Sequence, residues 1–308
     1  CISCGACVYQ CPFGALSDKS FILDAIKMLK NCDRVYAVVA PAIVSQFTYA
    51  KPGQVITAIK ALGFCDVLEA ALGADMVAYN EAAELAERGF LTSSCCPAFV
   101  SYIRKSFPEL QENISHNMSP MATIAKRIKE KDPEAKTVFI GPCTAKKGEF
   151  QLPEVHKYVD CVLTFEELQA MFDSRELDVG AMEETVLNNA SGYGRIFAHC
   201  GGLAEAAAEA LKEQGIDFEL KPLSCNGIEE CKLALMKAAR GKLDANFVEG
   251  MACVGGCVNG AGCMTHNERN RVKVDAHSQQ AQLKSITDSL LYAAEIDREL
   301  KEKAGDKA

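Results

Sequence analysis

Short apolar runs alternate with amphipathic segments along most of this chain. The apolar runs are too short for helices and are rich in β-branched residues, so we expect buried strands at 34–40, 67–69, 137–140, 161–163, 195–198, 218–223 and 245–248. Apolar residues recur at helical spacing at 20–30, 54–62, 76–88, 98–106, 120–131, 165–172, 203–214 and 228–240. Strands that alternate with helices in this way predict an α/β protein.

Local signals set some of the boundaries. Ser119-Pro120 combines an N-cap with proline at the first helical position, and Thr164-Phe-Glu-Glu167 is a capping box. Lys131-Asp-Pro-Glu-Ala135 has the composition of a loop. We expect this loop to divide the body, residues 31–275, into lobes at about 31–135 and 136–275, followed by a polar-faced helical tail at 276–308.

Composition narrows the class of protein. With 308 residues, 49% of them hydrophobic, the chain has ample material for a core. Its formal net charge of −8 and pI of about 5.3 disfavour binding to nucleic acid or to anionic membranes. No run of 18 apolar residues and no signal-peptide pattern occurs, so we expect no membrane span and a cytoplasmic location.

Cysteine usage points to metal chemistry. Disulfide frameworks are typical of short secreted domains with small cores, whereas this chain has 16 cysteines in a long, core-rich sequence. Three of its segments present cysteine among proline and glycine, and the cysteines are Cys96, Cys143, Cys253 and Cys257. Four thiolates are what an iron–sulfur cubane needs. Because the ligands are far apart in sequence, the fold must assemble the site. Free thiolates of this kind also imply a reducing and anaerobic cytosol.

The N-terminal residues contain a second, local cysteine pattern. Cys1, Cys4, Cys7 and Cys11, followed by Pro12, match the bacterial ferredoxin run Cys-x2-Cys-x2-Cys-x3-Cys-Pro. The first three cysteines of such a run share one [4Fe–4S] cluster, and the fourth usually serves a second cluster. We therefore expect residues 1–30 to be a partial ferredoxin-like segment, preceded in the natural protein by another such motif.

Other residues near these segments suggest proton chemistry. Cys95 precedes Cys96, and a thiol beside a cluster ligand is either spare packing or a proton carrier. Glu81, Glu84 and Arg88 lie on one face of the predicted helix at 76–88, where they form either a solvated stripe or a row of titratable groups that leads inward. The hydroxyl of Ser115 can bridge two carboxylates because it both donates and accepts.

Taken in order, the three cysteine segments resemble the signature motifs of [FeFe]-hydrogenases. The matching sequences are Thr-Ser-Cys-Cys-Pro around Cys96, Pro-Cys-x-x-Lys-Lys from Pro142, and Glu-x-Met-x-Cys-x-x-x-Cys ending at Cys257. The resemblance extends from the ferredoxin run to about Gly262. It implies a two-lobed catalytic domain with small mixed sheets flanked by helices, and the reversible reaction 2H⁺ + 2e⁻ ⇌ H₂.

The resemblance also implies a cofactor, the H-cluster. It consists of a [4Fe–4S] cubane on the four scattered cysteines and a two-iron site that carries CO, cyanide and an azadithiolate, with Cys257 as the bridge. Lys146 would hydrogen-bond one cyanide, and Met251 would pack near the bridging CO. The segment Ala40-Pro41-Ala42 would contact the other cyanide, and Pro142 is expected among the cofactor-binding residues.

A proton route and a set of partners follow from the same resemblance. The route would run from Cys95 through water to Glu81, Ser115, Glu84 and the surface residue Arg88. Electrons would come through accessory [4Fe–4S] clusters from a redox partner such as ferredoxin or another electron carrier. Maturation proteins would supply the two-iron site, and H₂ and protons would be the substrates.

The chain departs from the usual motifs at several places. Gly141 stands where a methionine is common, Phe99 where tryptophan is usual, and Ala42 where a serine can donate to cyanide. The pattern is similar to a divergent branch of the family. Two alternatives to the enzyme are a hydrogen-responsive sensor of low turnover and a non-catalytic iron–sulfur assembly protein.

The remaining cysteines and histidines receive plain interpretations. We expect small buried apolar residues at Cys32, Cys65, Cys161, Cys225 and Cys231. Surface or capping roles are expected for His116, His156 and His277, while Cys200 and Cys263 stay unassigned.

Overall fold

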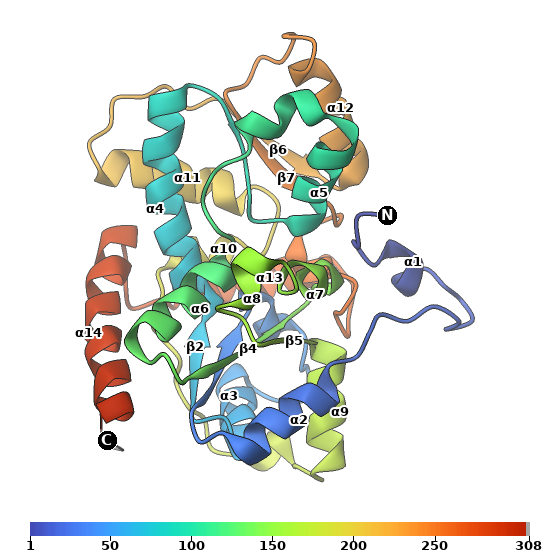
Figure 1. Cartoon of the computed structure of the whole chain (residues 1–308), viewed down its shortest axis with the longest axis vertical. Helices are drawn as coiled ribbons and strands as arrows, with labels where there is room; N and C mark the ends of the chain where they lie inside the picture. The colour runs from blue at the N-terminus through green and yellow to red at the C-terminus, as the bar shows by residue number, and fades with distance from the viewer. Residues whose placement is uncertain (306–308) are drawn as a thin grey trace.

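A four-stranded parallel sheet forms the base of one lobe of the molecule, which we describe from a computed structural model of residues 1–305 (Figure 1). In the order β2-β1-β4-β5, its strands are Asp66–Glu69, Val35–Val39, Lys136–Gly141 and Cys161–Thr164. The strands are almost wholly buried, as the continuous apolar runs predict. The helices that pack against them include α2 (Ile22–Asn31), α3 (Pro52–Ala61), α6 (Pro120–Lys131) and α9 (Phe165–Ser174).

A smaller sheet forms the second lobe. Its order is β3-β7-β6, and the strands are Leu91–Thr92, Phe247–Met251 and Pro222–Asn226. The helices α11 (Gly202–Glu213) and α12 (Ile228–Ala238) pack against this sheet, and α5 (Pro97–Ser106) packs against α12. The α/β architecture is confirmed. The expectation of mixed sheets is wrong, because every strand pair in both sheets is parallel.

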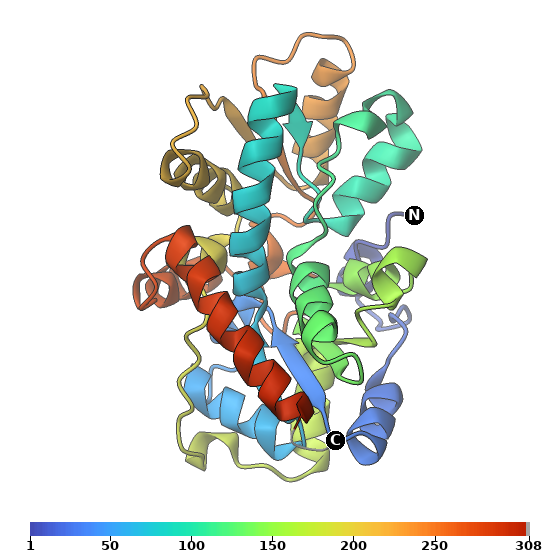
Figure 2. The same ribbon diagram turned by 60° about the vertical axis from the view of Figure 1, so that its left-hand side comes forward.

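One long helix joins the two lobes. The helix α4 (Ala70–Arg88) starts at the end of β2 and runs from the larger lobe along the smaller one (Figures 1 and 2). It packs against α6, α10 (Gly192–Ile196), α11 and α14 (Ile286–Gly305). Its first half is buried all round, which explains why the amphipathic pattern predicts a helix only from residue 76.

The other elements are short or lie near the termini. They are α1 (Ala6–Tyr9), α7 (Thr144–Glu149), α8 (Pro153–His156), α13 (Arg269–Gln279) and the 3₁₀ turns η1 (Pro41–Ser45), η2 (Pro108–Asn113), η3 (Val179–Ala181) and η4 (Cys257–Asn259). Among residues 1–305, no helix combines the length and the apolar character needed to cross a bilayer.

Four predictions about the fold need correction. The strand expected at 218–223 begins only at Pro222 and extends to Asn226. Residues 195–198 belong to the end of α10 and the turn after it, because Arg195 sits in a buried ion pair and not in a strand. The predicted tail is two helices, α13 and α14, and its residues 306–308 lie outside the described part. The lobes are not consecutive halves divided near residue 135, because β1 and β2 share a sheet with β4 and β5. Parallel pairing requires crossovers, and the chain uses them to pass between lobes.

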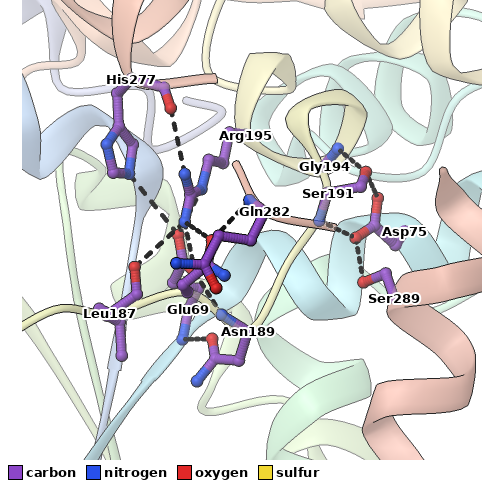
Figure 3. A network of polar contacts seen from close by, with 11 residues as sticks. Glu69, Asp75, Leu187, Asn189, Ser191, Gly194, Arg195, His277, Gln282 and Ser289 are labelled. Atoms are coloured by element: carbon purple, nitrogen blue, oxygen red, sulfur yellow. Dashed lines mark hydrogen bonds and ion pairs between the residues drawn. The ribbon is translucent and has the colours of Figure 1, made fainter. Parts of the chain in front are cut away.

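A buried polar network fixes α10 against β2 and α4 (Figure 3). Arg195 donates from Nε to Glu69 Oε1 at 2.8 Å and from Nη2 to Glu69 Oε2 at 3.0 Å. The same carboxylate accepts the backbone N–H of Asn189, whose side-chain oxygen accepts the N–H of Glu69. Nearby, Asp75 accepts hydrogen bonds from Ser191 and Ser289, which connects α4 to α14. The segment before α10, which contains Asn189 and Ser191, is thereby held to the long helix.

The charge of Asp75 should make the stability of the fold pH-dependent. Burial raises the pKa of Asp75 to about 7, although its hydrogen bonds act in the opposite direction. Between about pH 4 and 7 the folded state therefore holds a proton that the unfolded chain has lost, and the free energy of unfolding falls as pH rises. We expect the stability of wild type relative to Asp75→Asn to fall by ~2–4 kcal/mol from pH 4.5 to pH 8. Urea denaturation at several pH values measures this difference, and a constant difference would contradict the assignment.

Candidate functional site: a thiol-lined cavity between the lobes

The two sheets direct the carboxyl ends of their strands toward one internal cavity. The cavity has a volume of about 90 Å³ and an almost wholly apolar lining. The segments that follow β1, β3, β4 and β7 all contribute to its wall. In parallel sheets, the loops after the carboxyl ends commonly build the ligand site, and here two sheets share one such site.

The four scattered cysteines all line this cavity. Cys96 is the N-cap of α5 and Cys143 is the N-cap of α7, so each sits where a helix begins. Cys257 is the first residue of η4, and Cys253 lies in the turn between β7 and η4. The predicted convergence of these sulfurs is what the structure shows.

The chemistry of these thiols fits a cluster. Burial raises the pKa of Cys143 to about 11, and neighbouring thiols add to the rise. Burial likewise raises the pKa values of Cys253 and Cys257, and both are also influenced by Cys143 and Cys96. In residues 1–305, no three metal-binding side chains are close enough to share a single ion. Four thiols around one cavity suit a cubane, in which each sulfur binds a different iron.

The ferredoxin-like segment packs beside the same cavity. Cys4 contributes to the cavity wall, and the hydroxyl of Thr144, next to Cys143, donates to Ser3 O at 3.1 Å. Gly5 has φ of 77°, and a Cβ there would meet Thr144 Oγ1 and Ala261 Cβ at 2.4 Å. Only glycine permits so close an approach. Two more cysteines of the run, Cys1 and Cys7, are exposed.

The fourth cysteine of the ferredoxin run lies apart from the cavity. Cys11 does not contribute to the cavity wall. Backbone N–H groups of Phe13, Ala15 and Leu16 lower the pKa of the Cys11 thiol, which favours the thiolate form that binds metal.

The other predicted cofactor contacts also meet at the cavity. Its wall includes Ala40, Pro41, Ala42, Pro142 and Met251.

The cavity wall also explains one departure from the usual motifs. A Cβ at Gly141 would lie 2.5 Å from the ring of Phe139, and Phe139 itself lines the cavity. In this chain, therefore, a phenylalanine two residues earlier fills space that a side chain at 141 would otherwise occupy.

Lys146 enters the cavity wall as part of a buried ion pair. Its Nζ lies 2.7 Å from Glu149 Oε2 and donates to the carbonyl of Cys95 at 3.3 Å. Burial alone would lower the pKa of Lys146, but the Glu149 carboxylate outweighs it and the net shift is upward. The ammonium group therefore stays charged beside the cavity and can hold an anionic ligand.

A row of polar residues leads from the cavity to the surface. Cys95 lines the cavity, and burial raises its pKa well above the ordinary value, with the charge of Glu81 adding to the effect. Burial raises the pKa of Glu81 to about 8, and the nearby Ser115 hydroxyl offsets part of the rise. Neither oxygen of Glu81 makes a hydrogen bond within the described residues. Ser115 donates to Glu84 Oε2 at 3.1 Å, so it contacts one carboxylate and does not bridge two.

Glu84 and Arg88 form the outer part of this row. Glu84 Oε1 lies 3.0 Å from Arg88 Nη1, and Glu84 Oε2 accepts from the side chain of Asn117 at 3.0 Å. The exposed fraction of the side chain is 14% for Glu84 and 26% for Arg88. The residues of the predicted row therefore lie between the cavity and solvent, and hydrogen bonds connect Ser115, Glu84 and Arg88.

Residues 33–261 match the family described as "Iron only hydrogenase large subunit, C-terminal domain", and residues 1–17 match the family "4Fe-4S binding domain". The first match covers well over half of the chain. This chain belongs to the iron-only hydrogenase family.

Known relatives of this hydrogenase-family chain differ in what their names describe. It is 30% identical to Iron hydrogenase 1 of Clostridium pasteurianum, over 91% of this chain and 58% of that protein. It thus spans little more than half of that relative. It is 38% identical to the cytosolic Fe-S cluster assembly factor NAR1 of Kluyveromyces lactis, over 29% of this chain and 19% of that one. A solved variant of [FeFe]-hydrogenase HydA1 from Chlamydomonas reinhardtii has a TM-score of 0.74 at 21% identity, covering 90% of this chain and 94% of that one. This last likeness shows the fold.

Two residues of the hydrogenase-family site were missed in the sequence. Glu149 pairs with Lys146 three residues earlier, a helical spacing that would have revealed it if α7 had been predicted. Glu249 is fully buried, and it accepts N–H groups of Gly201 and Ala204 at the start of α11. It thereby fixes β7, which leads to Cys253, against that helix. Glu249 is the first residue of the motif that ends at Cys257, but nothing in the sequence indicates its contact with a helix more than 40 residues away.

The remaining cysteines are mostly buried, as predicted. Cys161, Cys225 and Cys231 are buried, whereas Cys32 is half-buried and Cys65 is exposed, which corrects the prediction for these two. Of the two cysteines left unassigned, Cys263 is buried and Cys200 is half-buried.

Two histidines have partners that sequence spacing does not show. His277 Nε2 lies 3.7 Å from Glu69 Oε1 in the buried network, and His116 Nδ1 lies 2.9 Å from Glu84 Oε1. His116 is on the surface as expected, but it belongs to the polar row.

Proposed function

We propose that this chain is the catalytic part of an [FeFe]-hydrogenase and interconverts protons, electrons and H₂. The observation that carries the proposal is the polar row from Cys95 to Arg88, which reaches the surface from the cavity that holds the four thiols. A bare iron–sulfur cubane needs electrons but no such path for protons. A buried acid with a pKa near the working pH at the inner end of the row is suited to proton transfer.

The residues present would hold the H-cluster in this cavity. Cys96, Cys143, Cys253 and Cys257 would bind the cubane, and Cys257 would also bridge to the two-iron site. When bound, the cluster supplies the formation and cleavage of the H–H bond. The protein would keep the site dry, because the wall is apolar, and the Lys146 ammonium would compensate negative charge on cyanide. Ala40, Pro41, Ala42, Pro142 and Met251 would pack against the two-iron site.

The side chains of the row would move protons by donating and accepting in turn. The Cys95 thiol is protonated at neutral pH and can donate its proton toward the cavity. Glu81, which is also protonated near pH 7, can then protonate Cys95 again through a water. Ser115, which donates to Glu84 in this structure, would accept from a protonated Glu84 and turn its hydroxyl to donate toward Glu81, because a hydroxyl can do both. Arg88 holds the charge of Glu84 at the outer end.

Electrons would enter through the ferredoxin-like segment. Cys1, Cys4, Cys7 and Cys11 would bind accessory [4Fe–4S] clusters, and Cys4 and Thr144 bring that segment directly to the cavity wall. We propose a ferredoxin or another electron carrier as the redox partner and maturation proteins as the source of the two-iron site. We also propose a cytoplasmic location, and we divide the chain into the segment at 1–30, the catalytic body at 31–275 and the helical tail.

A second candidate is an iron–sulfur assembly function, favoured by the likeness to NAR1. That function would require cubanes on the same cysteines without a two-iron site. The buried Lys146–Glu149 pair and the row from Cys95 argue against it, since neither would have a task there. A sensor of low turnover is the third candidate and differs from the enzyme in rate alone.

Infrared spectra and hydrogen evolution decide among the three functions. The protein is produced together with the maturation proteins of an [FeFe]-hydrogenase, and its spectrum is recorded under anaerobic conditions. We expect CO and cyanide bands and rapid H₂ evolution with a strong reductant. A four-iron spectrum without these bands would support the assembly function, and bands with very slow evolution would support the sensor.

A further inference from the structure

The proposed proton route ends on a residue that is poorly suited to exchange protons with water. Arginine side chains stay protonated in proteins, so Arg88 can stabilise Glu84 by its charge but cannot pass a proton on near neutral pH. Its guanidinium is also engaged, through Nη1 with Glu84 Oε1 and through Nη2 with the carbonyl of Glu112. Another group must therefore connect Glu84 to solvent.

His116 has the position that this connection requires. Its Nδ1 lies 2.9 Å from Glu84 Oε1, while 74% of its side chain is exposed. Imidazole is the side chain that ordinarily gains or loses a proton between pH 5 and 8. One face of the ring thus contacts the last carboxylate of the row and the remainder meets water.

The surroundings of His116 accommodate the ring in two protonation states. Its Nδ1 also lies 3.4 Å from Arg88 Nη1, which is a donor. A protonated Nδ1 can donate to Glu84, and an unprotonated Nδ1 can accept from Arg88. The backbone N–H of His116 donates to both oxygens of Glu84 at 3.1 and 3.2 Å, so the carboxylate stays beside the ring in either state.

We propose that His116 is the residue that exchanges protons between solvent and the row, an inference that rests on the proposed hydrogenase function. In H₂ evolution, the ring that carries its proton on Nδ1 takes a second proton at Nε2 from water or buffer, and Nδ1–H then gives its proton to Glu84 Oε1. In H₂ oxidation the same transfers run in reverse. In H₂ evolution, each transfer moves one proton and leaves the ring protonated on Nε2, and the exposed imidazole regains the Nδ1–H form by exchanging protons with water before the next transfer.

The groove beside His116 gives it access to solvent. The groove has a volume of about 650 Å³, and His116, Ser115 and Asn117 lie along it. The titratable groups that face the ring are Glu84 and Arg88 of α4, and the other charged groups that line the groove are Arg104, Lys105, Glu112, Glu149 and Glu154. Glu84 and Arg88 carry opposite charges. The Nδ1 side of the ring therefore faces both a carboxylate that can accept its proton and a permanently charged guanidinium.

The first test compares H₂ evolution by wild type, His116→Gln and His156→Gln across pH 5.5 to 8.5 in weak buffer. Glutamine keeps the backbone contacts to Glu84 but cannot exchange protons, and His156 is an exposed histidine that does not line the groove. We expect His116→Gln to be about tenfold slower with an altered pH profile, and imidazole added to the solution to restore the rate. His156→Gln should match wild type, and infrared bands should be unchanged in both.

The outcomes separate this inference from the proposed function. If wild type evolves H₂ and His116→Gln has the same rate and pH profile, His116 is not the exchange residue and the hydrogenase stands. If His116→Gln is slow but imidazole gives no rescue, the residue has a structural role and the inference is likewise overturned. A wild type without H₂ evolution, despite intact CO and cyanide bands, would overturn both.

A second test needs no cofactor. In the metal-free protein, the ¹⁵N resonances of the His116 ring should shift when Glu84 is replaced by glutamine, because Nδ1 loses a charged partner. The resonances of His156 serve as the internal reference. Unchanged His116 resonances would show that the contact does not exist in solution, which removes the basis of the inference.

Discussion

Replacing Cys95 by alanine is expected to lower the rate of H₂ evolution by roughly two to four orders of magnitude, which is the usual effect of losing a positioned acid. Cys95 lines the cavity and its thiol is protonated at neutral pH, since burial raises its pKa. It is adjacent in sequence to Cys96 but is not one of the four cubane ligands proposed above. Iron content and the CO and cyanide bands should therefore be retained while turnover is lost.

The interpretation of this variant depends on matched controls. Cys161→Ala removes a buried thiol from the larger sheet, away from the cavity wall, and should evolve H₂ at the wild-type rate. Cys95→Ser replaces the thiol with a hydroxyl of similar size that is a much weaker acid, so we expect this variant to evolve H₂ as slowly as Cys95→Ala. A wild-type rate for Cys95→Ala would show that protons reach the cavity by another way.

Much of the fold could be predicted because local patterns and tertiary contacts agree. The buried strands of the larger sheet appear in the sequence as continuous apolar runs, and β1 and β4 were found within one or two residues. The prediction failed where a distant partner decides the structure. Arg195 looks like part of an apolar strand, yet its guanidinium pairs with Glu69, which is 126 residues away. The short β3 is defined only by its pairing with β7.

The candidate site was predicted in its ligands and missed in its supports. The four cysteines stand in recognisable segments, and their convergence follows from strands that end at one cavity. Glu149, Glu249 and His116 act through contacts between elements, and their spacing in the sequence does not reveal these contacts. Distances along the chain also misled the division into lobes, because a parallel sheet is completed by segments that return from elsewhere.

Cys257→Ala is expected to abolish incorporation of the two-iron site. Cys257 lines the cavity, and neighbouring thiols raise its pKa beyond the effect of burial, so a metal must stabilise the thiolate. As the proposed bridge, it is the one protein ligand that the two-iron site would share with the cubane. Alanine leaves that site without a covalent attachment, and the CO and cyanide bands should disappear from the infrared spectrum of the matured protein, with complete loss of H₂ evolution.

The neighbouring thiol of Cys263 provides the control for this variant. Cys263 is buried in the same loop and its Sγ contacts the carbonyls of Val258 and Cys257, but it does not line the cavity. Cys263→Ala therefore removes a thiol and creates a similar local void while the four proposed ligands remain. We expect it to keep the infrared bands. If Cys257→Ala also kept them, the bridge would be a different cysteine, and loss of bands in both variants would point to the packing of the loop and not to a ligand.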